Sequence, residues 1–206
     1  MREPLSLIYE KKMMKIYKLT LTILIIAFTF SCNEQKVKLT NHKVADLRTT
    51  FPLPNEYELI SGDDMINIIQ NGNNIPVNGI LRDKMNTKQT HFVKKNDVDD
   101  SVMITNTLPR IEIEKSFLNA FSQIIVDGTL KNVDKIKEYK LIEKKLLKTA
   151  NNNKALKVKY EFDVNKDKRY FSFYLITTSY ESFMVSNLTD NKIDIQNMVT
   201  RYLNKN

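Results

Sequence analysis

The sequence of 206 residues is poor in the residue types that usually carry recognisable chemistry, with one cysteine, two histidines and four glycines. A single cysteine cannot close a disulfide within the chain or supply a cysteine-rich metal site. The histidines belong to no H-E-x-x-H or similar metal-binding arrangement. The glycines, Gly62, Gly72, Gly79 and Gly128, are too dispersed for a phosphate-binding loop. We therefore expect no cofactor and no metal ion.

The sequence also lacks a sign of nucleophilic catalysis. No serine lies in a G-x-S-x-G elbow, and a Ser-His-Asp triad would have to use His91. His91 is expected at the start of a strand, as an ordinary surface or edge-strand residue, and His42 in a polar spacer. No catalytic residue is therefore predicted.

The densest group of carboxylates is Asp97, Asp99 and Asp100 in "NDVDD", with the pair Asp63 and Asp64 earlier in the chain. Oxygen ligands at alternate positions can bind calcium, but this segment lacks the glycine and the distal glutamate of an EF-hand. The segment is predicted to be an acidic hairpin turn.

An uncharged apolar stretch, "LTLTILIIAFTF", covers residues 19–30 and follows Lys11, Lys12, Lys15 and Lys18. Twelve helical residues rise only about 18 Å, against about 30 Å of bilayer hydrocarbon. A basic segment followed by an apolar segment of this length is typical of a secretory signal peptide.

The stretch ends in Thr29-Phe30-Ser31-Cys32, which resembles the lipobox of bacterial lipoproteins. The resemblance implies cleavage between Ser31 and Cys32, after which Cys32 is the first residue and is acylated, for example by palmitate, on its sulfur and its amino group. Two or more acyl chains anchor a protein stably, whereas one binds reversibly. An uncleaved N-terminal anchor with an incidental cysteine is the alternative.

These observations predict three segments. Residues 1–31 are a signal peptide, whose true start is Met1 or Met14. Residues 32–50 are a lipidated N-terminus and flexible spacer, and residues 51–206 are a single globular domain. Removing residues 1–31 takes five of 32 basic and two of 24 acidic residues, which leaves a net charge of 27 − 22 = +5. This mild excess favours an anionic membrane surface under the tether and no nucleic acid.

The first half of the domain contains several short segments with strand character. Strands are predicted at Tyr57–Ile60, Pro76–Leu81, His91–Lys95 and in "DDSVMITNTL". Residues 65–69 are predicted to form either one short helical segment or a loop.

A helix is predicted from Arg110 to Val126, with Pro109 near its start and Gly128 just past its end. One apolar stripe supports it, formed by Phe117, Leu118, Phe121, Ile124 and Ile125. Core packing is the preferred interpretation of this stripe.

The second half contains the clearest strand pattern. Residues 139–148 fit a strand or a helix, and a strand is preferred. Apolar and charged residues then alternate from Leu156 to Val164, which predicts a strand with one buried face and one wet face. "YFSFYLITTS" and "SFMVSNL" follow after short polar turns, so three strands form an antiparallel meander.

A C-terminal helix is predicted after the meander, with Thr189 or Asp190 as its N-cap. Its apolar stripe consists of Ile195, Met198, Val199 and Tyr202. This element order predicts an α+β domain in which two helices pack on an antiparallel sheet with a three-strand C-terminal meander. Over residues 51–204 it resembles the PsbP-like fold, and a cystatin-like sheet wrapped on one helix is the alternative.

The function expected from the sequence is that of an envelope lipoprotein that binds or assists another envelope protein without catalysis. One alternative is a tethered hydrolase with a site assembled from scattered residues. The other is a carrier of a lipid or small apolar ligand, which requires a cavity between the helix at 110–126 and the sheet. The last hairpin is rich in aromatic residues, namely Tyr170, Phe171, Phe173, Tyr174, Tyr180 and Phe183. Some of them could line a groove for a ligand or partner, but packing in the core and on the sheet is the preferred interpretation.

Overall fold

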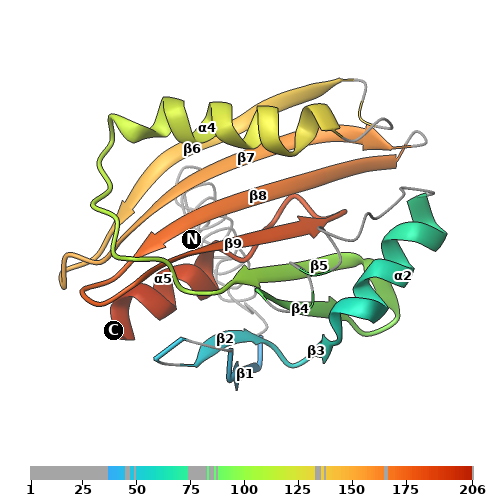
Figure 1. Ribbon diagram of the computed structural model, residues 1–206, viewed down its shortest axis with the longest axis horizontal. Helices are drawn as coiled ribbons and strands as arrows, with labels where there is room; N and C mark the ends of the chain where they lie inside the picture. Colours follow the sequence, from blue (N-terminus) through green and yellow to red (C-terminus); the bar gives the residue numbers. More distant parts are fainter. Residues whose placement is uncertain are drawn as a thin grey trace, which may run out of the picture. The chain divides into compact units, whose positions relative to one another are not determined.

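The computed structural model describes residues 37–44, 47, 48, 50–73, 83, 86, 88–132, 136, 138–164 and 167–205 (Figure 1). Its compact unit extends from Lys38 to Asn206. The strands within these residues are β1 (Leu39–His42), β2 (Phe51–Pro54), β3 (Tyr57–Ile60), β4 (Gln89–Lys94), β5 (Asp97–Thr105), β6 (Tyr139–Lys148), β7 (Lys154–Val164), β8 (Asp167–Thr177) and β9 (Ser182–Thr189). The helices are α2 (Gly62–Asn73), α4 (Phe117–Gly128), the short 3-10 helix η1 (Leu130–Asn132) and α5 (Gln196–Lys205).

Seven strands form one antiparallel sheet in the order β3-β4-β5-β9-β8-β7-β6, while β1 and β2 form a separate antiparallel pair. The expected meander is confirmed as β7, β8 and β9, and residues 139–148 form the strand β6. The α+β class with an antiparallel sheet is therefore confirmed. Strand β9 lies between β5 and β8, so it joins the two halves of the sheet.

Helix α4 lies along β6 and β7 and covers one face of the sheet (Figure 1). Its buried residues pack against β7 and β8 in one apolar cluster, formed by Ile113, Leu118, Phe121, Ile125, Val126, Leu130, Leu156, Val158, Tyr160 and Phe173. The Tyr160 hydroxyl also lies 2.6 Å from Ser122 Oγ. Burial of each large apolar side chain stabilises the fold by about 1.5–3 kcal/mol, so Leu118, Phe121 and Ile125 of the predicted stripe attach α4 to the sheet. The prediction that the whole stripe packs in the core is wrong for Phe117 and Ile124, which are 49% and 65% exposed.

Helix α5 and the β1–β2 pair cover residues of the opposite face. Val199, Tyr202 and Leu203 of α5 share one apolar cluster with residues of β2, β4, β5, β8 and β9. The Tyr202 ring lies 5.4 Å from Phe51 and 5.3 Å from Phe183, measured between centroids. Helices therefore lie on both faces, which differs from the cystatin-like alternative of a sheet wrapped on one helix.

The predicted flexible spacer of residues 32–50 is too long. Strand β1 pairs with β2 from Leu39 opposite Pro54 to His42 opposite Phe51. Val44 and Leu47 are buried in the same apolar cluster as α5. Val44 and Leu47 contribute single side chains to this cluster and belong to no helix or strand. The sequence around them therefore has neither a helical nor a strand periodicity. The remainder of the spacer, to residue 36, lies outside the described residues, as do Ser31 and Cys32.

The predicted helix at 110–126 begins seven residues later, at Phe117, and Gly128 is its last residue. Residues 110–114 do not join the helix, because backbone groups of this segment are bonded elsewhere. Leu108 forms an isolated bridge with Ser182, and the Ile111 N–H donates to Ser182 Oγ at 2.8 Å. Pro109 consequently lies before this non-helical segment and does not begin the helix.

The uncertain segment at residues 65–69 belongs to the three-turn helix α2. Ser61 precedes the helix, and its Oγ accepts the N–H of Asp64 at 3.0 Å, as an N-cap side chain does. Met65 and Ile66 pack on Val93 of β4. Strand β3 has the predicted bounds, Tyr57–Ile60. Strands β4 and β5 correspond to the strands predicted at His91–Lys95 and in "DDSVMITNTL". The strand predicted at Pro76–Leu81 lies outside the described residues.

The prediction that one face of β7 is wet is wrong for Lys157 and Lys159, whereas Asp163 on the same face is exposed. Lys157 and Lys159 alternate with buried apolar residues, as the sequence shows, yet each is only 3% exposed. Residues of the β9–α5 connection and of β6 cover them. The polar half of the alternation therefore marks a buried polar layer.

Candidate functional site

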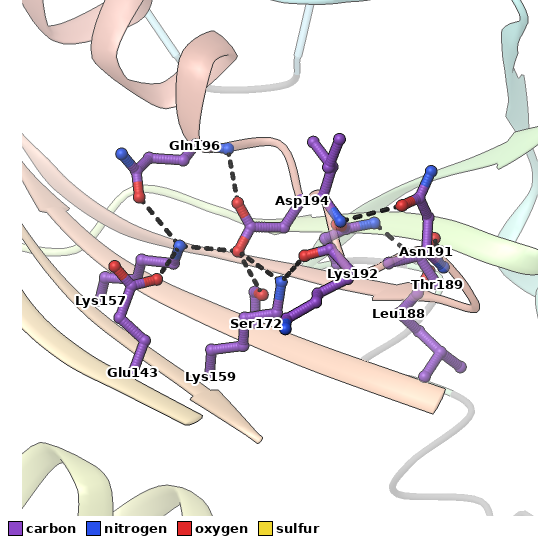
Figure 2. Close-up of polar contacts among 12 residues, drawn as sticks. Glu143, Lys157, Lys159, Ser172, Leu188, Thr189, Asn191, Lys192, Asp194 and Gln196 are labelled. Carbon is purple, nitrogen blue, oxygen red and sulfur yellow. Dashed lines mark hydrogen bonds and ion pairs between the residues drawn. The ribbon is translucent and has the colours of Figure 1, made fainter. Parts of the chain in front are cut away.

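Two buried lysines of β7 form the centre of a polar cluster under the connection between β9 and α5 (Figure 2). We name this group the buried lysine cluster, and it comprises Glu143, Lys157, Lys159, Ser172, Asp194 and Gln196. Its members come from β6, β7, β8, the β9–α5 connection and the first residue of α5. The cluster thus joins three consecutive strands to the start of the C-terminal helix.

Short local hydrogen bonds shape the connection that supplies Asp194. The Asn191 N–H donates to Thr189 Oγ1 at 3.1 Å, and the Ile193 N–H donates to Asn191 Oδ1 at 3.0 Å. Asparagine and threonine side chains commonly form such turns with their own backbone. The Gln196 N–H then donates to Asp194 Oδ1 at 3.0 Å. Asp194, and not Thr189 or Asp190, therefore caps the C-terminal helix.

The other carboxylate oxygen of Asp194 is the meeting point of the cluster. Asp194 Oδ2 lies 2.8 Å from Lys157 Nζ and 3.3 Å from Lys159 Nζ. Ser172 Oγ donates to the same oxygen at 2.8 Å. The Asp194 side chain is only 4% exposed, so these contacts replace the water that it loses on folding.

Each ammonium group has further partners. Lys157 Nζ lies 2.5 Å from Glu143 Oε2 and donates to Gln196 Oε1 at 2.9 Å. Lys159 Nζ donates to the Lys192 carbonyl. Aromatic rings of β8 complete the surroundings, with Lys157 Nζ 5.7 Å from the Tyr174 centroid and Lys159 Nζ 5.2 Å from the Tyr170 centroid. Two lysines face two carboxylates, so the cluster is balanced in charge.

The electrostatics keep the carboxylates ionised. Burial by itself would raise the pKa of Asp194, but the hydrogen bond and charge of Lys157, with Ser172 and Lys159, lower it to about 2. Burial likewise opposes ionisation of Glu143, while Lys145 and Lys157 lower its pKa. Burial, followed by the charge of Asp194, raises the pKa of the Tyr174 phenol. At neutral pH the cluster therefore contains carboxylates beside an un-ionised phenol.

This geometry suits a structural cross-link better than a reaction centre. A catalytic lysine needs a neutral amine and access to a substrate. Lys157 and Lys159 are instead buried and contact carboxylate and carbonyl oxygens. The cluster fixes the start of α5 on the sheet. Sequence reasoning missed it, although two lysines on one face of a strand and an aspartate just before an amphipathic helix were both visible.

A second polar group lies at the β4–β5 end of the sheet. Ligand-type oxygens of Asp97, Asp100 and Asp190 lie within 4.8 Å of one another. Asp100 is buried, where Tyr57 donates to its Oδ1 at 2.5 Å and Thr189 Oγ1 donates to its Oδ2 at 3.1 Å. Burial raises the pKa of Asp100 despite these hydrogen bonds. The prediction that the acidic segment is a hairpin turn is wrong, because Asp97 and Asp100 belong to β5 and the turn is formed by Lys95 and Asn96 before them.

The structure places both histidines in strands, His91 away from the predicted surface or edge position and His42 outside a flexible spacer. His91 lies inside β4, an interior strand, and is 1% exposed. His42 lies in β1, where its ring meets Phe92 edge-on at 4.9 Å, and burial lowers its pKa. A buried imidazole is not presented to a substrate, so a triad built on His91 has no support.

The aromatic residues of the last hairpin mainly pack in the core, as preferred from the sequence. Phe173, Tyr174 and Phe183 are at most 2% exposed. Tyr180 differs, since it is 62% exposed at the β8–β9 turn and lies under the guanidinium of Arg48 at 4.8 Å.

No protein-family model matches the chain, and no curated protein matches its sequence. Similar solved structures include cyanobacterial PsbP (CyanoP) from Synechocystis sp. PCC 6803, with a TM-score of 0.48 and 10% identity over 83% of this chain and 90% of that chain.

Two further solved structures are similar. LpqN, involved in cell envelope biogenesis of Mycobacterium tuberculosis, has a TM-score of 0.36 and 13% identity over 82% of this chain and 87% of that chain. PA94, a protein of unknown function from Pseudomonas aeruginosa, has a TM-score of 0.33 and 8% identity over 80% of this chain and 90% of that chain. All three TM-scores are below 0.5, so the fold class rests on strand order and register, and no function is taken from these proteins.

Within the described part of the chain, none of the helices is both long enough and apolar enough to cross a membrane.

Proposed function

We propose that the chain is a lipoprotein of the bacterial cell envelope, tethered to a membrane by acylated Cys32, and that its domain is a non-enzymatic binding or accessory module. The observation that carries the proposal is the uncharged stretch at residues 19–30, which follows lysines and ends in Ser31-Cys32. Its length fits a signal peptide that is cleaved before a lipidated cysteine.

The position of β1 limits the distance between the folded domain and a lipid on Cys32. Residues 33–38 separate Cys32 from Leu39, the first residue of β1. Chain of this length extends at most about 25 Å. A lipid on Cys32 would therefore hold the folded body close to the bilayer, within reach of membrane-bound partners.

The packing favours binding over the two alternatives. The hydrolase alternative has little support, because His91 is buried and the buried lysines are held by carboxylates. The carrier alternative requires a cavity between α4 and the sheet, where Leu118, Phe121 and Leu156 are packed in one cluster instead.

Intact-protein mass spectrometry of membrane-extracted protein tests the proposal. The wild-type chain is expected to have the mass of residues 32–206 plus acyl groups, and Cys32→Ala is expected to carry no lipid. Ser31→Ala serves as a control because alanine keeps a small residue before the cysteine. A wild-type chain that retains residues 14–31 and lacks lipid would show that the proposal is wrong.

A further inference from the structure

Strand β6 forms one edge of the seven-stranded sheet and is ten residues long. It pairs with β7 on one side, and no strand among the described residues pairs with its other side. The opposite edge, β3, has only four residues. An edge strand presents a row of backbone N–H and C=O groups that can pair with another chain. The β6 edge offers the longer row of the two.

The side chains of β6 give this edge a strong positive charge. Its ten residues contain four lysines and one glutamate, a net charge of 4 − 1 = +3. The glutamate, Glu143, already contacts Lys157 and Lys145. Lys140, Lys144 and Lys148 are exposed, and Asn119 of α4 accepts a hydrogen bond from Lys144 at 2.6 Å. Cationic groups thus lie along the whole edge.

Apolar side chains stand beside these lysines. Tyr139 and Leu141 are 39% and 41% exposed, and they lie opposite Phe162 and Tyr160 in the register with β7. The register then shifts at Ile142, because Glu143 lies opposite Lys159. This bulge leaves a regular run of six residues, Glu143–Lys148, for further pairing.

We infer that the β6 edge receives an extended acidic segment of a partner protein as an additional strand of the sheet. Main-chain hydrogen bonds provide affinity in such strand addition, and alternate side chains provide specificity. Opposite charges on paired strands are favourable and like charges are not. A second copy of β6 is therefore a poor partner, because both strands would have a net charge of +3.

An acidic polypeptide suits the edge better than an anionic membrane does. Lipid headgroups can neutralise lysines, but they offer no ladder of backbone N–H and C=O groups. The inference specifies the partner class of the proposed binding module, and it does not depend on the lipid anchor. The peptide experiment below can therefore fail while the mass measurement on Cys32 succeeds.

The test uses the full chain in nonionic detergent and an eight-residue peptide of alternating glutamate and valine. Binding is measured by fluorescence anisotropy of the labelled peptide. Hydrogen exchange measured by mass spectrometry locates the contact. We expect the peptide to bind and to slow exchange within residues 139–148, since side-chain attraction alone would not protect these amides.

A charge-reversed variant, Lys140→Glu with Lys144→Glu and Lys148→Glu, is compared with a matched control, Lys88→Glu with Lys95→Glu and Lys205→Glu. All six lysines are exposed, so both variants have the same net charge and should fold, which circular dichroism checks. Exposed ion pairs each contribute little, but the three act together, so the β6 variant is expected to bind about tenfold or more weakly. The control is expected to retain most of the binding.

Several results would overturn the inference. Equal loss of binding in both variants would mean that net charge alone attracts the peptide. Equal binding of a peptide of alternating lysine and valine would remove the charge argument. If mixed micelles that contain phosphatidylglycerol slow exchange in β6 while the acidic peptide does not, the edge is a membrane contact and not a strand acceptor.

Discussion

Leu156 and Lys157 are neighbours on β7 and are almost equally buried, at 0% and 3% exposure, but on opposite faces of the sheet. Leu156 is covered by apolar side chains of the α4 cluster. Lys157 is covered by Asp194, Glu143 and Gln196. One strand therefore contributes to a core by two physical mechanisms.

Apolar packing and buried ion pairs respond differently to substitution. Apolar burial is non-directional and roughly proportional to area. A buried ion pair gains little net stability, because loss of hydration opposes the Coulomb attraction, yet removal of one partner is very costly. The α4 face should therefore accept a range of apolar side chains, whereas the α5 face should depend on each member of the buried lysine cluster.

The largest expected effect is that of Asp194→Ala. The substitution leaves Lys157 and Lys159 without their shared carboxylate and removes the cap of α5. Loss of one partner of a buried pair costs about 3–5 kcal/mol, and we expect the free energy of unfolding to fall by that amount in urea titrations at pH 7. Asp163→Ala is the control, because Asp163 is an exposed acid on β7, the strand of the two lysines, and its removal should change stability little. Equal effects of the two substitutions would contradict a special role for the cluster.

Leu156→Ala tests the apolar face at the adjacent position. Truncation of a buried leucine costs about 2–5 kcal/mol through lost burial and a residual cavity. We expect this loss to be the same at pH 7 and pH 3, because no titrating group is removed. Leu156→Met, which nearly conserves volume, should cost less than about 1.5 kcal/mol. A strongly pH-dependent effect of Leu156→Ala would show that the two faces are not energetically separate.

The smallest expected effect is the acid dependence of the α5 face. The pKa of Asp194 is about 2 in the fold, against an ordinary value of 3.8. Because the folded pKa is lowered, its contribution is fully present above about pH 4 and is lost as the pH falls toward 2. The shift corresponds to about 2 kcal/mol. Wild type should therefore lose about that much more stability than Asp194→Asn between pH 4 and pH 2, and parallel curves would contradict the assignment.

The fold class could be predicted because its signals are local. Alternation along β7, the polar segment "NKDKR" after it and the apolar residues on both faces of β8 are enough to predict a meander from the sequence. The period of α5 likewise appears in the sequence as an apolar stripe.

The buried lysines could not be predicted with the same ease. Alternation shows which side chains share a face, but it does not show whether that face meets water. For Lys157 and Lys159, the answer depends on Asp194, which lies more than thirty residues later in the chain. Lysine is seldom buried unless it is paired, so a wet face was the reasonable prediction from the pattern.

The start of α4 was missed for a related reason. Residues 110–116 have no strong helix breaker, but the Ile111 carbonyl accepts a hydrogen bond from Thr177 at 2.9 Å, and its N–H is bonded to Ser182. These tertiary bonds compete with helix formation. Sequence patterns contain no information on partners so distant.

The central position of β9 has a consequence for the order in which the chain can fold. Strands β3–β5 come from the first half of the chain and β6–β8 from the second, and β9 at residues 182–189 is the strand that pairs with both groups. The sheet can close only after nearly all of the polypeptide is available. Folds dominated by such long-range pairings acquire their structure slowly, so the completed chain should spend longer without its sheet than a chain of the same length whose strands pair only with sequence neighbours.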